Sequence, residues 1–151
     1  MRYVPDGVPV ANLHLVWSGV WPFLEKAANR FPHLPNKFTE ELVLKKLFHK
    51  EQQLWICWDM AENRAVGAVT TEIVQDSKHP GKVFLSIALV GGERFNAWGD
   101  DLWRLLKAWG VEKGCTHILG SGRRGWIRLY GFVDCGTTDS GLPMFVQTLK
   151  R

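Results

Sequence analysis

The sequence is poor in cysteine, has no long apolar run and contains no low-complexity segment. Its 151 residues include three cysteines, Cys57, Cys115 and Cys135, whose odd number and spacing match no zinc motif or disulfide framework. The apolar neighbours of Cys57 and Cys115 predict reduced core residues. No apolar run has the length of a membrane span, and no signal peptide is recognisable. We therefore expect no membrane contact and a cytoplasmic protein, or one enclosed in a particle assembled there.

The formal net charge of +4 is mild. It is compatible with a polyanionic ligand or a nucleic-acid surface but requires neither. Arg123, Arg124 and Arg128 form the main basic cluster, which could contact phosphate or could be the solvated start of a short helix. We favour the second interpretation, which argues against nucleic acid as a partner.

The pattern of apolar residues predicts a single domain, residues 1–151, of mixed helices and strands. An edge strand is expected within Met1–Ala11. Asn12 is expected to cap a helix over Leu13–Asn29 that kinks or restarts at Pro22, and Thr39 to cap a second helix. The later strands alternate or are β-branched, and they are bounded by turn residues. They are expected at Leu54–Met60, Ala65–Gln75, Val83–Val90, Thr116–Gly120, Val133–Gly136 and Leu142–Leu149.

The stretch from Val83 to Phe132 carries the most informative pattern in the sequence. After the apolar strand Val83–Val90 comes a loop, Glu93 to Gly99, and then the clearest helix, Asp100 to Lys113. Its apolar residues follow at i, i+3, i+4 and i+7, and they are Leu102, Leu105, Leu106 and Trp109. A strand, a glycine-bearing loop and a helix N-terminus can together hold an anion, because the first-turn amides are unpaired and the helix dipole favours negative charge.

The loop reads Arg94-Phe95-Asn96-Ala97-Trp98-Gly99, and Gly114-Cys115, a strand and Gly131-Phe132 follow it. This order resembles the Arg-x-x-Gly-x-Gly/Ala core pattern of the GNAT superfamily of N-acetyltransferases. The resemblance implies an α/β, GNAT-like three-layer domain with a mixed central sheet of six to seven strands flanked by about four helices. It also implies an acetyl-CoA-dependent N-acyltransferase that acts on a small-molecule or protein amine and needs no metal.

The same resemblance implies a cofactor site. Backbone amides from Phe95 through Asn96, Ala97 and Trp98 to Gly99 would bond the pyrophosphate of acetyl-CoA, and Arg94 would add positive charge. Leu89 takes the place where the strand parts from its neighbour and pairs with the pantetheine arm.

Several residues depart from the family pattern. Ala97 replaces a glycine, Trp98 is bulky, and Asp100 with Asp101 would place two carboxylates in the first helical turn, where they would compete with phosphate. The family's proton-donating Tyr, four places before the closing glycine, is matched by Ile127.

No catalytic group stands out. Tyr130 is near that place but would face another direction on a helix. Glu72, or Asp59, could serve as a base through water, although we favour solvent-facing roles for both carboxylates.

A second hypothesis is a catalytically degenerate GNAT-fold protein with a structural or binding role. Residues 122–128, Gly-Arg-Arg-Gly-Trp-Ile-Arg, resemble a closing element of small phage-encoded proteins, including internal virion components. The partner would then be a phage or host protein, and the location could be the virion. The departures at Ala97, Asp100, Asp101 and Ile127 favour this hypothesis, whereas the spacing from Arg94 to Gly114-Cys115 favours retained binding of acetyl-CoA.

Overall fold

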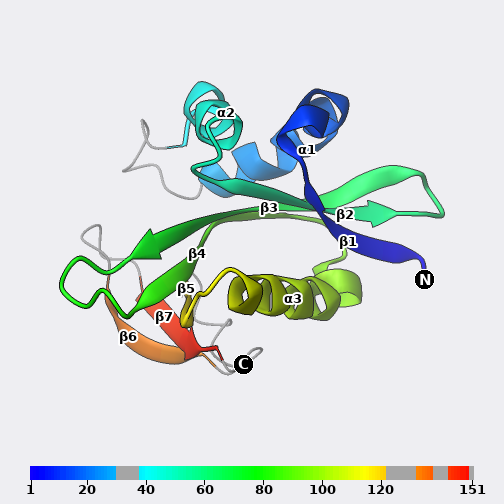
Figure 1. The fold of residues 1–151 in the computed structure, drawn as a ribbon. Coiled ribbons are helices and arrows are strands. Elements are labelled where there is room, and N and C mark those ends of the chain that lie inside the picture. The colour runs from blue at the N-terminus through cyan, green and yellow to red at the C-terminus, as the bar shows by residue number, and fades with distance from the viewer. Residues whose placement is uncertain (30–37, 122–131, 138–142, 150–151) are drawn as a thin grey trace. The chain divides into compact units, whose positions relative to one another are not determined.

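The computed structural model describes residues 1–29, 38–121, 132–137 and 143–149. Their strands form a mixed seven-stranded sheet in the order β1-β2-β3-β4-β5-β7-β6 (Figure 1). The elements in chain order are β1 (Tyr3–Val8), η1 (Val10–Asn12), α1 (Leu13–Ala28), α2 (Glu40–Phe48), β2 (Gln53–Asp59), β3 (Arg64–Gln75), β4 (Val83–Gly92), α3 (Phe95–Glu112), β5 (His117–Ser121), β6 (Val133–Thr137) and β7 (Pro143–Thr148). The mixed α/β sheet that the sequence predicts is confirmed. The fourth helix expected from the resemblance lies outside the described residues.

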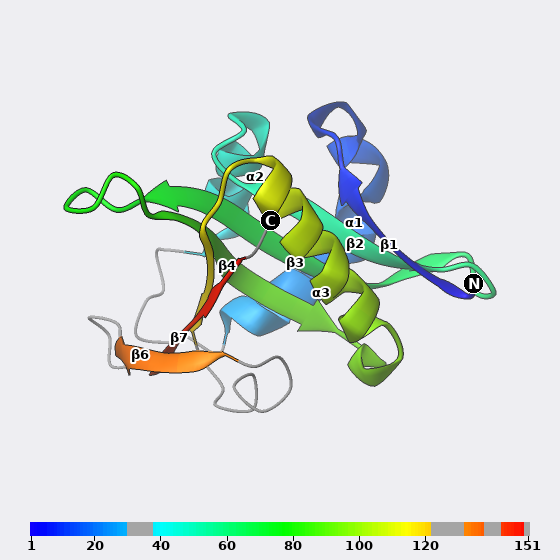
Figure 2. The same ribbon diagram turned by 60° about the horizontal axis from the view of Figure 1, so that its bottom comes forward.

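The chain divides into two compact units, and the first consists of Met1–Thr71 and Leu89–Leu105. Here β1 and β2 pair antiparallel, as do β2 and β3, which confirms the predicted hairpin. Within this unit α1 and α2 cover one face of the strands, and the start of α3 lies on the other (Figures 1 and 2). The apolar core on the α1 and α2 side is formed by Leu13, Val20, Leu24, Ala27, Val43, Leu47, Leu54, Ala65, Ala68 and Leu89.

The two N-terminal helices begin close to the predicted residues but differ in their capping. Thr39 accepts a hydrogen bond from the Leu42 amide at 3.2 Å, which confirms the predicted cap of α2. Asn12 is the N-cap residue of α1, but its side chain makes no capping bond, because the chain enters the helix through the 3-10 turn η1. Pro22 does not divide α1, which is one helix of 16 residues. Pro22 and Ser18 are exposed, so water can bond the Ser18 carbonyl that the proline cannot.

The second unit consists of Glu72–Ala88 and Leu106–Arg151. Here β4 pairs parallel with β5, and β7 pairs antiparallel with both β5 and β6. Gly110 of α3 lies against Leu85 and Leu149, so this part of the helix approaches its neighbours closely. Cys57 in the first unit and Cys115 in the second are buried free thiols, as expected. Among the described helices, none combines the length and apolar character needed to cross a membrane.

Candidate cofactor-binding site

The helix α3 starts at Phe95, five residues earlier than predicted, so the expected loop from Glu93 to Gly99 is wrong. Arg94 adopts a left-handed backbone conformation (φ 57°) that turns the chain sharply at the end of β4, and its carbonyl accepts a bond from the Ala97 amide at 2.9 Å. Asp100 and Asp101 consequently lie in the second turn of α3. They are therefore not placed to occupy the first-turn amides that a phosphate would use.

The side chains of the first turn point in two directions. Asn96 and Ala97 are exposed, whereas Trp98 and Gly99 are buried. Alanine has the best helix propensity of all residues, so Ala97 has no conformational cost at this helical position. Although the Ala97 amide is bonded to the Arg94 carbonyl, the N-terminus of α3 places its positive dipole end beside small, uncharged, exposed side chains, an arrangement suited to an anion.

Trp98 fills the space under the end of β4. Its ring packs edge-on against Phe95, with centroids 5.0 Å apart, and its Nε1–H donates to the Glu93 carbonyl at 2.9 Å. A Cβ built on Gly67 of β3 would lie 2.3 Å from the indole ring. Only a residue without a side chain fits there, so Trp98 and Gly67 form one packed unit that supports the turn from β4 into α3.

The strand β4 reverses its side-chain alternation between Leu85 and Leu89. Leu85 packs against Gly110 of α3, whereas Leu89 belongs to the core with α1 and α2. Residues four apart on a regular strand point to the same face. We therefore infer a β-bulge between Leu85 and Leu89, a feature that bends a strand and ends regular pairing.

The backbone hydrogen bonds of β4 show the same reversal. Val83 donates to the Thr116 hydroxyl at 3.0 Å and accepts from the Thr116 amide at 2.8 Å, both toward β5. Leu89, also an odd-numbered residue, donates instead to the Thr70 hydroxyl of β3 at 3.1 Å. The amide of Leu89 is therefore engaged by β3, and strand alternation turns the amide of Val90 to the opposite side.

The ladder between β4 and β5 is short. It runs from Phe84 opposite His117 to Ser86 opposite Leu119, although β5 continues to Ser121. The ladder therefore ends within the stretch in which we infer the bulge. Among the described residues, pairing of β4 with β5 is therefore limited to the stretch that ends at Ser86.

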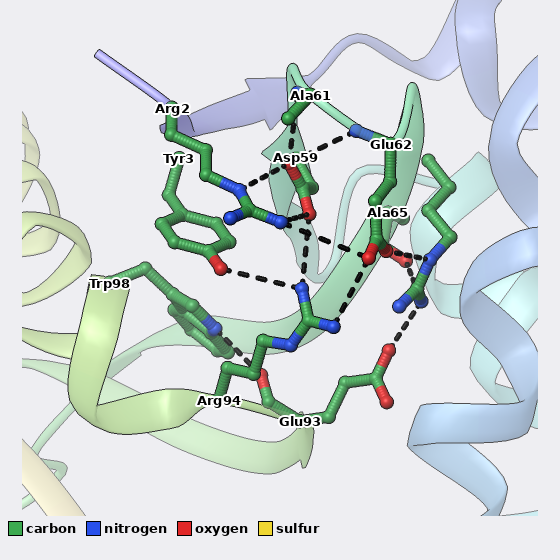
Figure 3. A network of polar contacts seen from close by, with 10 residues as sticks. Arg2, Tyr3, Asp59, Ala61, Glu62, Ala65, Glu93, Arg94 and Trp98 are labelled. Carbon is green, nitrogen blue, oxygen red and sulfur yellow. Dashed lines mark hydrogen bonds and ion pairs between the residues drawn. The ribbon is translucent and has the colours of Figure 1, made fainter.

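A network of alternating charges surrounds the turn at Arg94 (Figure 3). Asp59, at the end of β2, is fully excluded from solvent and accepts from Arg2 through two bonds of 3.1 Å and from Arg94 Nη1 at 3.3 Å. Arg94 also donates to Glu62 at 3.1 Å and to the Tyr3 hydroxyl at 3.4 Å. The guanidinium that was expected to face phosphate thus has three partners of its own.

Two further ion pairs, both made by Arg64, extend this network. Arg64 bonds Glu62 at 2.7 Å and also pairs with Glu93, the residue before the turn. Three arginines thereby balance three carboxylates. The formal charges of this network therefore cancel, so the network itself adds no net attraction for phosphate.

The candidate proton-transfer groups are Asp59, Glu72 and Tyr130. The pKa of Asp59 is lowered to about 2, first by the hydrogen bonds from Arg2 and then by those from the Glu62 and Ala61 amides. A carboxyl that acidic is a poor general base at neutral pH. Glu72 lies half-buried on β3, and Tyr130 lies outside the described residues.

The described residues offer neither a reactive thiol at Cys57 nor a cluster of metal-ligating side chains. Burial raises the pKa of Cys57 to about 11, so its thiol is not a nucleophile at neutral pH. Within residues 1–29, 38–121, 132–137 and 143–149, no three His, Cys, Asp or Glu side chains are grouped to hold a metal ion.

The low pKa of Asp59 predicts an acid-dependent loss of stability. Its folded-state pKa of about 2 lies below its ordinary value of 3.8, so the stabilisation is present above about pH 4 and is lost as the pH falls toward 2. We expect the difference in unfolding free energy between wild type and Asp59→Asn to shrink over this range, measured by urea unfolding from pH 5 to pH 2. A difference independent of pH would show that Asp59 is not held as an ion.

Comparisons with known proteins show which solved structures have a similar fold. No family model matches the chain, and no curated protein matches it in sequence. It is similar to the crystal structure of aminoglycoside 6′-acetyltransferase type Ii, with 13% identity, 98% of each chain covered and a TM-score of 0.72. A GNAT-family acetyltransferase from Listeria monocytogenes gives 10% identity and a TM-score of 0.61, covering 97% of this chain and 95% of that one. The PaiA N-acetyltransferase from Thermoplasma acidophilum, solved in complex with coenzyme A, gives 15% identity and a TM-score of 0.61, covering 98% and 99%.

Proposed function

Because the chain has the fold of the GNAT acetyltransferases, we propose that it is an acetyl-CoA-dependent N-acyltransferase acting on an amine. The observation that carries the proposal is the path of β4. The strand loses its pairing with β5 after Ser86 and turns at Arg94 directly into the first turn of α3. A parted strand offers unpaired backbone groups, and a helix N-terminus offers an anion site.

These features fit two neighbouring parts of coenzyme A, the pyrophosphate and the pantetheine arm. The first-turn amides of α3 would bond the pyrophosphate. The exposed side chains beside these amides, Asn96 and Ala97, carry no charge that would repel it. The backbone of β4 beyond the bulge would pair with the amide-bearing pantetheine arm. The similar PaiA structure, which contains coenzyme A, supports the assignment of this ligand class.

Acyl transfer from a thioester needs little covalent chemistry from the protein. Bound acetyl-CoA would supply an activated acyl group, and the chain would hold its carbonyl within reach of the amine. Backbone N–H groups aimed at the carbonyl oxygen can stabilise the charge that develops there. Holding the two reactants in place can lower the barrier by roughly 7–11 kcal/mol. A missing tyrosine at Ile127 is therefore compatible with a slow transferase.

Direct binding is the first test of the proposal. Acetyl-CoA at a hundredfold excess over its dissociation constant should raise the free energy of unfolding by about 2.7 kcal/mol, visible as a higher melting temperature. Absence of any shift at millimolar acetyl-CoA would reject the proposed function. Release of free thiol with a panel of amines then distinguishes an enzyme from a protein that binds acetyl-CoA without turnover.

A charge placed at the first turn of α3 should weaken this binding. Ala97→Glu puts a carboxylate beside the proposed pyrophosphate site, while Ala97→Gln adds nearly the same shape without charge. Ala97 is exposed and helical, so both variants should fold. We expect acetyl-CoA to bind Ala97→Glu at least tenfold more weakly than Ala97→Gln, measured by isothermal titration calorimetry. Equal affinities would mean that the pyrophosphate lies elsewhere.

A further inference from the structure

We propose that Asp59 is a positioning residue for cofactor binding, and that it acts by holding Arg94 in the conformation that aims the first-turn amides of α3. This inference rests on the proposed function. It assigns the network around Asp59 a role in affinity, although none of its carboxylates would touch the ligand.

The conformation of Arg94 is what needs to be held. Its positive φ is unfavourable for a residue with a side chain, and such outliers persist only where neighbouring groups over-determine them. Arg94 is also the residue whose carbonyl receives the Ala97 amide and so starts α3. The direction in which the helix leaves β4 therefore depends on this one residue.

Asp59 is placed to hold Arg94 rigidly. Its carboxylate is fully buried at the end of β2 and is itself fixed by the Ala61 amide at 2.9 Å, the Glu62 amide at 3.3 Å and the side chain of Arg2. Figure 3 shows the Arg94 guanidinium directed into this group. A buried anion fixed by several donors is a firm anchor for a side chain that has to reach it from another strand.

The residue before Arg94 is held as well. Glu93 donates its amide to the Val66 carbonyl at 2.8 Å, accepts the Trp98 indole N–H through its own carbonyl and pairs with Arg64 through its carboxylate. Both residues of the turn are thus attached to the β2–β3 hairpin. A turn held at both residues presents its amides in one arrangement, and such preorganisation increases affinity.

The direction in which Asp59→Asn changes the affinity for acetyl-CoA separates this role from direct phosphate contact by Arg94. If Arg94 binds phosphate itself, Asp59→Asn releases the guanidinium, and affinity for acetyl-CoA should stay equal or rise. If Asp59 positions the turn, the same change should weaken binding. We expect the dissociation constant of acetyl-CoA to increase about tenfold in Asp59→Asn, measured by isothermal titration calorimetry.

A matched control removes a purely structural explanation. Val43→Ala in α2 also destabilises the first unit, through a buried core residue far along the chain from the turn, and should leave the dissociation constant unchanged. An Asp59→Asn protein that binds as tightly as Val43→Ala, or more tightly, overturns the proposal. If Asp59→Asn does not fold, Arg94→Gly serves instead, since glycine tolerates the left-handed conformation but loses the anchor. Undiminished affinity in that variant overturns the proposal equally.

A ligand-free readout separates this proposal from the proposed function. If the wild type does not bind acetyl-CoA, the proposed function fails, yet the anchoring can still be measured. Hydrogen exchange of the Ala97 amide and the Trp98 indole N–H should be at least tenfold faster in Asp59→Asn than in Val43→Ala. Equal exchange rates in the two variants would show that Asp59 does not hold the turn.

Discussion

Replacing Trp98 by alanine is expected to lower the free energy of unfolding by about 3–5 kcal/mol, the usual cost of truncating a large buried aromatic residue. Trp98 is 1% exposed, and its ring fills the space left by two glycines, Gly67 and Gly92. The truncation removes that contact and also the hydrogen bond to the Glu93 carbonyl. Urea denaturation followed by far-ultraviolet circular dichroism measures the change.

A double-mutant cycle tests whether this loss of stability comes from the contact between Trp98 and Gly67. Gly67→Ala alone should destabilise, because its methyl would lie 2.3 Å from the indole ring. In a Trp98→Ala background the same methyl enters the vacated space, so its cost should fall by at least about 1 kcal/mol, a coupling expected of residues in contact. Strictly additive effects in this double-mutant cycle would contradict direct packing of Trp98 against Gly67.

Much of the fold could be predicted because its elements follow strong local patterns. The hairpin of β2 and β3 has β-branched and aromatic residues on both sides of a turn, and α2 has a threonine cap followed by two acids in its first turn. Such signals depend only on neighbours in sequence. Tertiary packing left them intact, so the predicted and observed elements agree to within a few residues.

The start of α3 was mispredicted because its cause is not local. Phe95 to Gly99 resemble a loop in sequence, with Asn96 and Gly99 as breakers and no apolar period. They are helical because Arg94 turns the chain with help from Asp59, 35 residues away, and because Trp98 finds a space lined by glycines. Neither partner can be recognised from the residues next to the helix.

The network around Asp59 was missed for the same reason. The sequence predicts a solvent-facing carboxylate at Asp59 and at most a weak candidate for a base, yet Asp59 is buried between Arg2 and Arg94. Pairing of β1 with β2 places Tyr3 opposite Asp59, which brings Arg2 to the carboxylate. One sequence signal could have indicated burial. Asp59 ends an apolar strand just before a turn, and the predicted edge strand beside it follows an arginine, Arg2.

Gly91→Ala is expected to destabilise the protein by about 3 kcal/mol, at the upper end of the usual cost of overpacking. A Cβ on Gly91 would lie 2.1 Å from the carbonyl oxygen of Phe23 and 2.7 Å from its carbonyl carbon. Both atoms belong to the backbone of α1, so no side-chain rotation can relieve the clash and the helix or the strand has to move. Thermal and urea unfolding measure the loss.

Gly19→Ala is the matched control, because it makes the same substitution inside α1 where a Cβ would meet nothing within 4 Å. Alanine is favoured over glycine in a helix, so this variant should be stabilised by roughly 0.4–1 kcal/mol. The two variants therefore add one methyl group each and should shift stability in opposite directions. A Gly91→Ala protein as stable as the wild type would mean that α1 does not rest on β4 at this residue. The strand end that leads into Arg94 and α3 would then lack the support on which the proposed cofactor site depends.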